Sequence, residues 1–112
     1  MKKIGKFDVP IFNHTVHVFD GLPNEEPRAA AKGYCVINFD TCNVEIYFKN
    51  RKVHTNIIVH EIIHAVDWIL HNCGIDAGTE KKDSEVRAYL VGYLLERTMR
   101  IINKKQNKEP KS

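Results

Sequence analysis

The chain has 112 residues, a formal net charge of +3 and a hydrophobic fraction of 43%. This length is typical of a single domain, and this apolar content is enough for a modest core. No segment is long and apolar enough to span a membrane, and the small net charge argues against a nucleic-acid partner. The odd count of three cysteines is typical of free thiols in a reducing compartment. We therefore expect a cytoplasmic protein with neither a membrane nor a nucleic-acid partner.

The first half of the chain has the composition of β-strands. Residues 12–19 alternate partly between apolar and polar side chains. Residues 33–39 and 43–48 are rich in β-branched and aromatic residues and form the clearest hairpin, around a turn at residues 40–42. We expect a small antiparallel sheet.

The second half predicts two helices. Apolar residues recur at three- and four-residue spacing after residue 55, which is typical of an amphipathic helix. Gly74 is the glycine expected just past its end, and Asp83 and Ser84 favour the start of a second helix after a polar loop. The apolar stripe of the first helix consists of Ile58, Ile62, Ala65, Val66 and Ile69. The predicted fold is α+β, with the small antiparallel sheet packed on two long antiparallel helices.

The C-terminal end of the chain concentrates the positive charge. Residues 97–112 contain six basic residues and one acidic residue. The last nine residues have no aromatic side chain on which a nucleic-acid base could stack, and their composition is typical of a disordered end. We expect one domain over residues 1–103 and a charged, disordered tail over residues 104–112.

The first predicted helix contains the motif H-E-x-x-H at His60, Glu61 and His64. Residues four apart lie on the same face of a helix, so the two histidines can bind one metal ion together. Glu61 projects beside them, where it can hold a metal-bound water. Two neutral imidazoles and a carboxylate that acts as general base are the groups that a zinc hydrolase needs.

A chance match is the alternative to a metal site. With six histidines and eight glutamates, this composition gives about a 2% chance of one such motif. The motif also lies on a predicted helix with an apolar opposite face, which lowers the chance further. We therefore favour the metal site over two surface histidines and a solvated glutamate.

A catalytic zinc ion usually takes three protein ligands, and the sequence offers His54, His71 and Glu85 for the third. His71 lies about 10 Å along a continuous helix from His64, too far for a shared ion, and is expected as an exposed residue of the last turn. His54 lacks a close geometry. Glu85 lies in the first turn of the second helix, and the loop of roughly ten residues is long enough to return it to the histidines. The alternative is a glutamate that merely favours the helix dipole.

The residues after Glu85 bear on this choice. Ala88 and Gly92 share its face, and small side chains there would let the two helices approach closely around a metal ion. Tyr89 and Tyr93 are candidates for an oxyanion donor, which has to be fixed near the metal. For each tyrosine we favour a half-buried ring with a solvated hydroxyl, and Tyr89 is the better candidate of the two.

Four further residues have simpler predicted roles. Asp67 follows His64 by three residues and either orients a ligand histidine or is solvated. Trp68, Cys35 and Cys73 are expected in the core.

The motif and the glutamate that follows it resemble those of the gluzincins, the zincins with H-E-x-x-H and a glutamate on the next helix. The matching residues are His60, Glu61, His64 and Glu85, and the resemblance covers roughly residues 34–99. It is closest to very short peptidase-like proteins of bacteria and phages. It implies a minimal zincin-like domain in which His60, His64 and Glu85 bind Zn²⁺ and Glu61 activates water. The implied partner is a peptide or protein substrate, which would pair with the strand at residues 43–48 or with its hairpin partner.

The chain departs from the family pattern at three points. Ile63 stands where many relatives have a small residue, and Tyr89 stands where larger gluzincins often have an acidic one. No long helix is predicted before the sheet. These differences bear on the substrate and the strength of activity more than on the metal site.

Two functions are consistent with these residues. The first is a zinc-dependent metallopeptidase with Glu61 as general base. The second is a non-catalytic zinc-binding structural or interaction module of phage or bacterial origin. The small size favours the module, because little chain remains to build substrate pockets. The intact Glu61 favours the enzyme, because a structural site needs no base, and we expect the enzyme.

Overall fold

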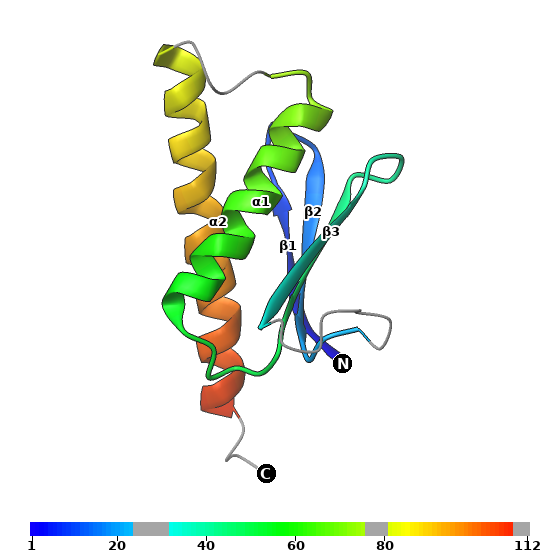
Figure 1. The fold of residues 1–112 in the computed structure, drawn as a ribbon, viewed down its shortest axis with the longest axis vertical. Helices are drawn as coiled ribbons and strands as arrows, with labels where there is room; N and C mark the ends of the chain where they lie inside the picture. Colours follow the sequence, from blue (N-terminus) through cyan, green and yellow to red (C-terminus); the bar gives the residue numbers. More distant parts are fainter. Residues whose placement is uncertain (24–31, 76–80, 109–112) are drawn as a thin grey trace.

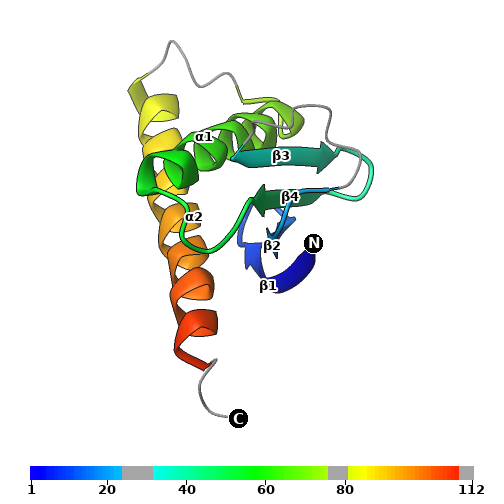
Figure 2. The same cartoon turned by 60° about the horizontal axis from the view of Figure 1, so that its bottom comes forward.

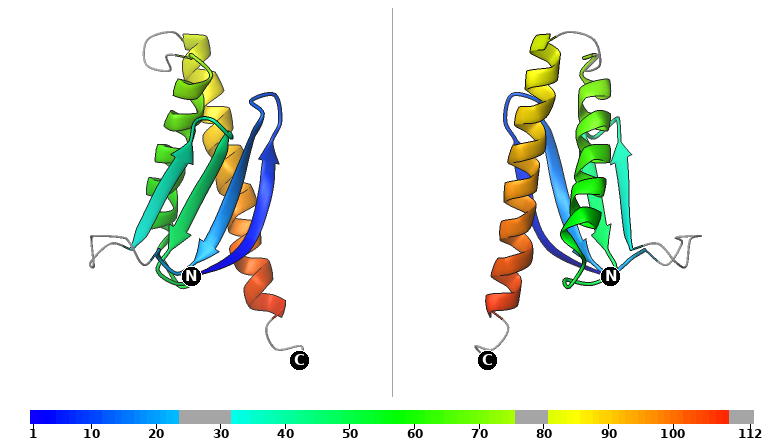
Figure 3. Two further views of the ribbon diagram at one scale, coloured as in Figure 1. Left: turned by 90° about the vertical axis from the view of Figure 1, so that its right-hand side faces the viewer. Right: turned by 60° about the vertical axis from the view of Figure 1, so that its left-hand side comes forward.

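The computed structural model describes residues 1–23, 32–75 and 81–108. The fold is α+β, as predicted, and both helices lie on the same face of one four-stranded sheet (Figure 1, Figure 3). The elements in chain order are β1 (Lys2–Val9), β2 (His14–Asp20), β3 (Gly33–Asn38), β4 (Asn43–Phe48), α1 (Thr55–Asn72) and α2 (Lys81–Lys108).

The sheet is mixed, so the prediction of a purely antiparallel sheet is wrong. The strand order is β1-β2-β4-β3, in which β1 pairs with β2 and β3 pairs with β4 antiparallel, whereas β2 and β4 are parallel. The antiparallel pairs join strands that follow one another closely in the chain. The β2–β4 pair joins distant segments and has no local sequence signal. Because β4 lies between β2 and β3, β3 is an edge strand.

The other edge strand, β1, was not predicted from the sequence. Only Phe7 and Val9 of this strand are buried, so the apolar alternation is short and lies among lysines. Gly5 lets α2 come close to the strand, because a Cβ added at Gly5 would lie only 2.8 Å from Cγ2 of Ile101.

The first helix begins and ends where the sequence predicts. Gly74 has φ +76°, a conformation that favours glycine. The N–H of Gly74 donates to the carbonyl of His71, and the N–H of Ile75 donates to the carbonyl of Leu70. These are the two hydrogen bonds of a Schellman motif, which ends the helix.

The core lies between the sheet and the helices. On the sheet, every second residue of a strand faces the helices and belongs to the core, and each helix adds one apolar stripe. The whole predicted stripe of α1 is buried. The sheet contributes Phe7, Val9, Val16, Val18, Val44, Ile46 and Phe48, and α2 contributes Leu90, Leu94 and Ile102.

The second helix is longer than predicted. It extends from Lys81 to Lys108, so residues 104–108 are drawn as helix, and the boundary between the domain and a disordered tail stays a prediction. Lysine and glutamine are good helix formers and can extend a helix that is already docked through Ile101 and Ile102. The last four residues of the predicted tail lie outside the described residues. Within the described ranges, neither helix combines the length and the apolar character needed to cross a membrane.

Candidate metal centre

His60 and His64 lie one turn apart on the exposed side of α1. Their Nε2 atoms are 3.2 Å apart, and their ring centroids are 4.7 Å apart. Two nitrogens bound to one tetrahedral zinc ion, at about 2.0–2.1 Å each, would be about 3.3 Å apart. Without the metal, one ring can donate an N–H to the other at the same distance. The pair therefore already has the separation that one metal ion requires.

Glu61 lies on the side of α1 that faces the edge strand β3. Its side chain is only 6% exposed. A Cβ added at Gly33 would lie 2.9 Å from Cγ and 3.0 Å from Oε2 of Glu61, so the carboxylate lies directly against the backbone of this strand. Gly33 was not singled out from the sequence, although a glycine at the start of a strand is a signal of close approach. The orientation of Glu61 thus depends on the absence of a side chain at Gly33.

Cys35 lies two residues further along β3, near the same carboxylate. Burial, and to a smaller extent the negative charge of Glu61, raises the pKa of the Cys35 thiol from 9.0 to about 12. The thiol therefore stays protonated at neutral pH. Cys35 packs against the core, as predicted. Cys73 is exposed, so the prediction of a core position for Cys73 is wrong.

Among the residues that the structure describes, no third ligand lies with the histidine pair. Within the described part of the chain, no three His, Cys, Asp or Glu side chains are grouped so that they could hold a metal ion. Glu85 is exposed on α2, and its role as a ligand stays a prediction. His54 is the N-cap residue of α1, and His71 contacts aromatic rings near the other end of that helix.

The two helices are joined by charged residues where small ones were expected. The prediction of a close approach at Gly92 is wrong, because a Cβ there would meet no described atom within 4 Å, and Ala88 is exposed. Instead, Arg87 donates from Nε to Oδ1 of Asp67 at 2.9 Å and from Nη2 to Oδ2 at 3.4 Å. The hydrogen bond to Asp67 raises the pKa of Arg87. This pair fixes the turn of α2 that contains Glu85 beside α1.

Asp67 is exposed, as the prediction of a solvated aspartate requires, and it pairs with Arg87. Its partner is 20 residues away on another helix, and no local spacing predicts such a pair. Because Asp67 is three residues after His64, the contact lies about one helical turn beyond the histidine pair.

The two candidate tyrosines have different environments. The hydroxyl of Tyr93 donates to the carbonyl of Asp8 at 2.9 Å, so it joins α2 to β1 and is not an oxyanion donor. Tyr89 is exposed, and its ring stacks on that of Tyr93 with 6.3 Å between centroids. The role of Tyr89 in the reaction stays a prediction.

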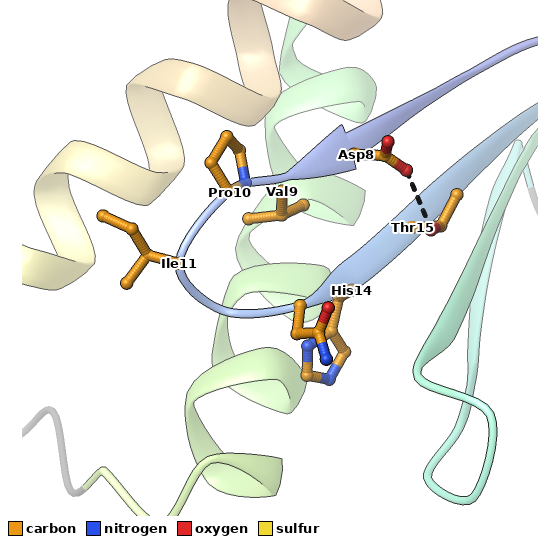
Figure 4. Close-up of a pocket in the computed structure, with 7 residues that line it drawn as sticks. Asp8, Val9, Pro10, Ile11, His14 and Thr15 are labelled. Atoms are coloured by element: carbon orange, nitrogen blue, oxygen red, sulfur yellow. Dashed lines mark hydrogen bonds between the residues drawn. The ribbon is translucent and has the colours of Figure 1, made fainter.

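A further histidine, His14, is buried where β2 begins, near the end of α1. Its Nδ1 lies 2.6 Å from the carbonyl of Phe12, and its Nε2 lies 3.0 Å from Nδ2 of Asn72. Both ring nitrogens are thus engaged, and His14 connects α1 to the β1–β2 turn. Figure 4 shows His14 beside the open cavity of that turn, which has a volume of about 500 Å³. We assign His14 a structural role.

Comparison with known proteins identifies no relative of this chain. No family model matches it, and no curated protein or solved structure is significantly similar to it. The candidate function therefore depends on the geometry of the histidine pair and Glu61.

Proposed function

We propose that this chain is a zinc-dependent metallopeptidase. The proposal depends on one observation: the Nε2 atoms of His60 and His64 lie 3.2 Å apart, on the helix that also carries the buried Glu61. Zinc is well suited to imidazole ligands at this separation. We propose Glu85 as the third ligand, because the Asp67–Arg87 pair holds its turn of α2 beside α1.

The chain's own residues have distinct roles in this mechanism. When bound, zinc would polarise the peptide carbonyl and lower the pKa of a water molecule. Glu61 accepts the proton of the attacking water at its carboxylate and delivers it to the leaving amine. Its burial against Gly33 holds the carboxylate in one orientation, so little reorganisation precedes the proton transfer.

The edge strand β3 is the proposed binding surface for the substrate backbone. Within the described residues, β3 pairs only with β4. It runs along α1, with Gly33 against Glu61 at one end and Phe39, just past the other end, against Trp68 (Figure 2). An extended peptide that pairs with this edge would lie beside the histidine face. The strand at residues 43–48 is β4, which is interior and has no free edge.

A second candidate is a non-catalytic zinc-binding module. The observation in its favour is the length of 112 residues, which leaves little chain to build substrate pockets. The buried Glu61 is an argument against it, because burying a carboxylate costs free energy and a structural site gains nothing from a base.

Zinc titration combined with a peptidase assay tests the proposal. The protein is freed of metal, dialysed against Zn²⁺ and then assayed on a degenerate peptide library. We expect about one zinc ion per chain and cleavage that requires zinc. Binding of zinc without cleavage of any peptide would favour the module, and no zinc binding would contradict both candidates.

We expect Gly33→Ala to reduce hydrolysis while zinc binding is kept. The added Cβ would lie 2.9 Å from Cγ of Glu61 and 3.1 Å from Cγ2 of Ile57, so the Glu61 side chain has to move. A displacement of about 1 Å can cost about 100-fold in rate. The matched control is Gly92→Ala, where the added Cβ meets no described atom within 4 Å. Equal kcat/KM values for Gly33→Ala and wild type would show that β3 does not set the orientation of Glu61.

A further inference from the structure

An exposed aromatic cluster lies at one end of the candidate site. It consists of Phe39, which follows β3, and of Trp68 and His71 on α1. The rings of Phe39 and Trp68 meet edge to face with centroids 5.7 Å apart, and His71 contacts both. Phe39 is 43% exposed and Trp68 is 42% exposed, so the expectation that Trp68 lies in the core is wrong. Large apolar surfaces of this kind, held by ring contacts, are typical of binding sites.

The aromatic cluster continues the histidine face of α1. Trp68 follows His64 by four residues, just as His64 follows His60, so the three side chains lie one above another on successive turns. One such step is about 6 Å along the helix axis. A ligand that lies over the histidine pair and runs toward the C-terminal end of α1 therefore reaches Trp68 next.

The edge strand leads to the same cluster. Gly33, at the start of β3, lies against Glu61, and Phe39, just past its end, lies against Trp68. The edge strand therefore runs from Glu61 to the aromatic cluster.

We propose that the aromatic cluster binds an aromatic or large aliphatic side chain of an extended peptide paired with β3, and so selects the substrate. This inference rests on the proposed function. In an extended peptide, side chains two residues apart point the same way and are separated by about 6.6 Å. That spacing matches the step of about 6 Å from His64 to Trp68. The selected side chain therefore lies about two residues from the peptide bond at the histidine pair.

Trp68 is the single tryptophan of the chain, so its fluorescence reports on the cluster directly. The test uses the full chain with Glu61→Gln and added Zn²⁺, so that peptides bind without being cleaved. The peptides are identical except at one position, which is Phe, Leu, Ser or Glu. We expect the Phe and Leu peptides to shift the Trp68 emission and to bind at least about tenfold more tightly than the other two.

Variants of the cluster complete the test. Phe39→Ala should abolish the apolar preference, and Phe39→Leu should restore most of it. Ile11→Ala, at an exposed apolar residue of the β1–β2 turn, is the matched control and should leave the preference unchanged. Binding that is equal for all four peptides would overturn the inference. A wild-type dimer that dissociates in Phe39→Ala would overturn it as well, because the cluster would then join two copies of the chain.

The inference and the proposed function fail in different ways. If peptides bind with the apolar preference but the wild type cleaves none of them, the subsite is supported and the peptidase is contradicted. If the wild type cleaves peptides at rates that depend on neither the apolar residue nor Phe39, the peptidase is supported and the subsite is contradicted.

Discussion

Glu61→Gln is expected to keep zinc and the fold while losing peptide hydrolysis by a factor of about 10²–10⁴. Glutamine has the size and shape of glutamate, so it can occupy the buried position between α1 and Gly33. It cannot accept the proton of the attacking water, because its side-chain amide is not basic at neutral pH. The loss should therefore appear in kcat, with the zinc content and the thermal unfolding curve close to those of the wild type.

The measurement compares wild type and variant on one substrate, with zinc content determined in parallel. The matched control is Glu96→Gln on α2, which removes the charge of an exposed glutamate that pairs with Arg100. This control should be as active as the wild type. Equal cleavage by Glu61→Gln and wild type would show that Glu61 is not the base. Loss of zinc or of the fold in Glu61→Gln would assign this residue a structural role.

The parts of the site that the sequence predicted are those that depend on local geometry. The approach of His60 to His64 follows from four-residue spacing on one helix, and the end of that helix at Gly74 follows from the demand for a positive φ. The buried stripe of α1 follows from the same periodicity. Each of these features involves residues within about three turns of one another.

The parts that the sequence did not predict depend on contacts between distant segments. The close approach of Gly33 to Glu61 requires that β3 lie beside α1, and this placement requires β4 to be inserted between β2 and β3. The Asp67–Arg87 pair and the contact of Phe39 with Trp68 join different elements in the same way. No spacing within a single segment indicates which distant residue will be the partner. The predicted role of Gly92 was wrong for this reason, since helical spacing shows which residues share a face but not what that face meets.

Removal of a single zinc ligand is expected to cause a large loss of zinc affinity. Loss of an outer-shell partner of a metal ligand costs roughly 10–100-fold in affinity. His60→Ala and His64→Ala each remove a direct ligand, so each should weaken zinc binding by more than that. Each change removes one of the two nitrogens that are 3.2 Å apart, and the remaining imidazole cannot chelate alone. Competition with a chromophoric chelator measures the affinity, and circular dichroism checks that each variant is folded.

The same titration decides the third ligand. Glu85→Ala should weaken zinc binding strongly, because Glu85 is the proposed third ligand, on the turn of α2 that Arg87 joins to Asp67 of α1. His71→Ala should leave the affinity unchanged, because His71 lies about 10 Å along α1 from His64 and its ring packs near Phe39 and Trp68. Glu96→Ala is the control for loss of a negative charge on α2. If His71→Ala loses zinc and Glu85→Ala keeps it, His71 is the third ligand and the assignment is reversed. If the zinc affinity is unchanged in both variants, neither residue is the third ligand.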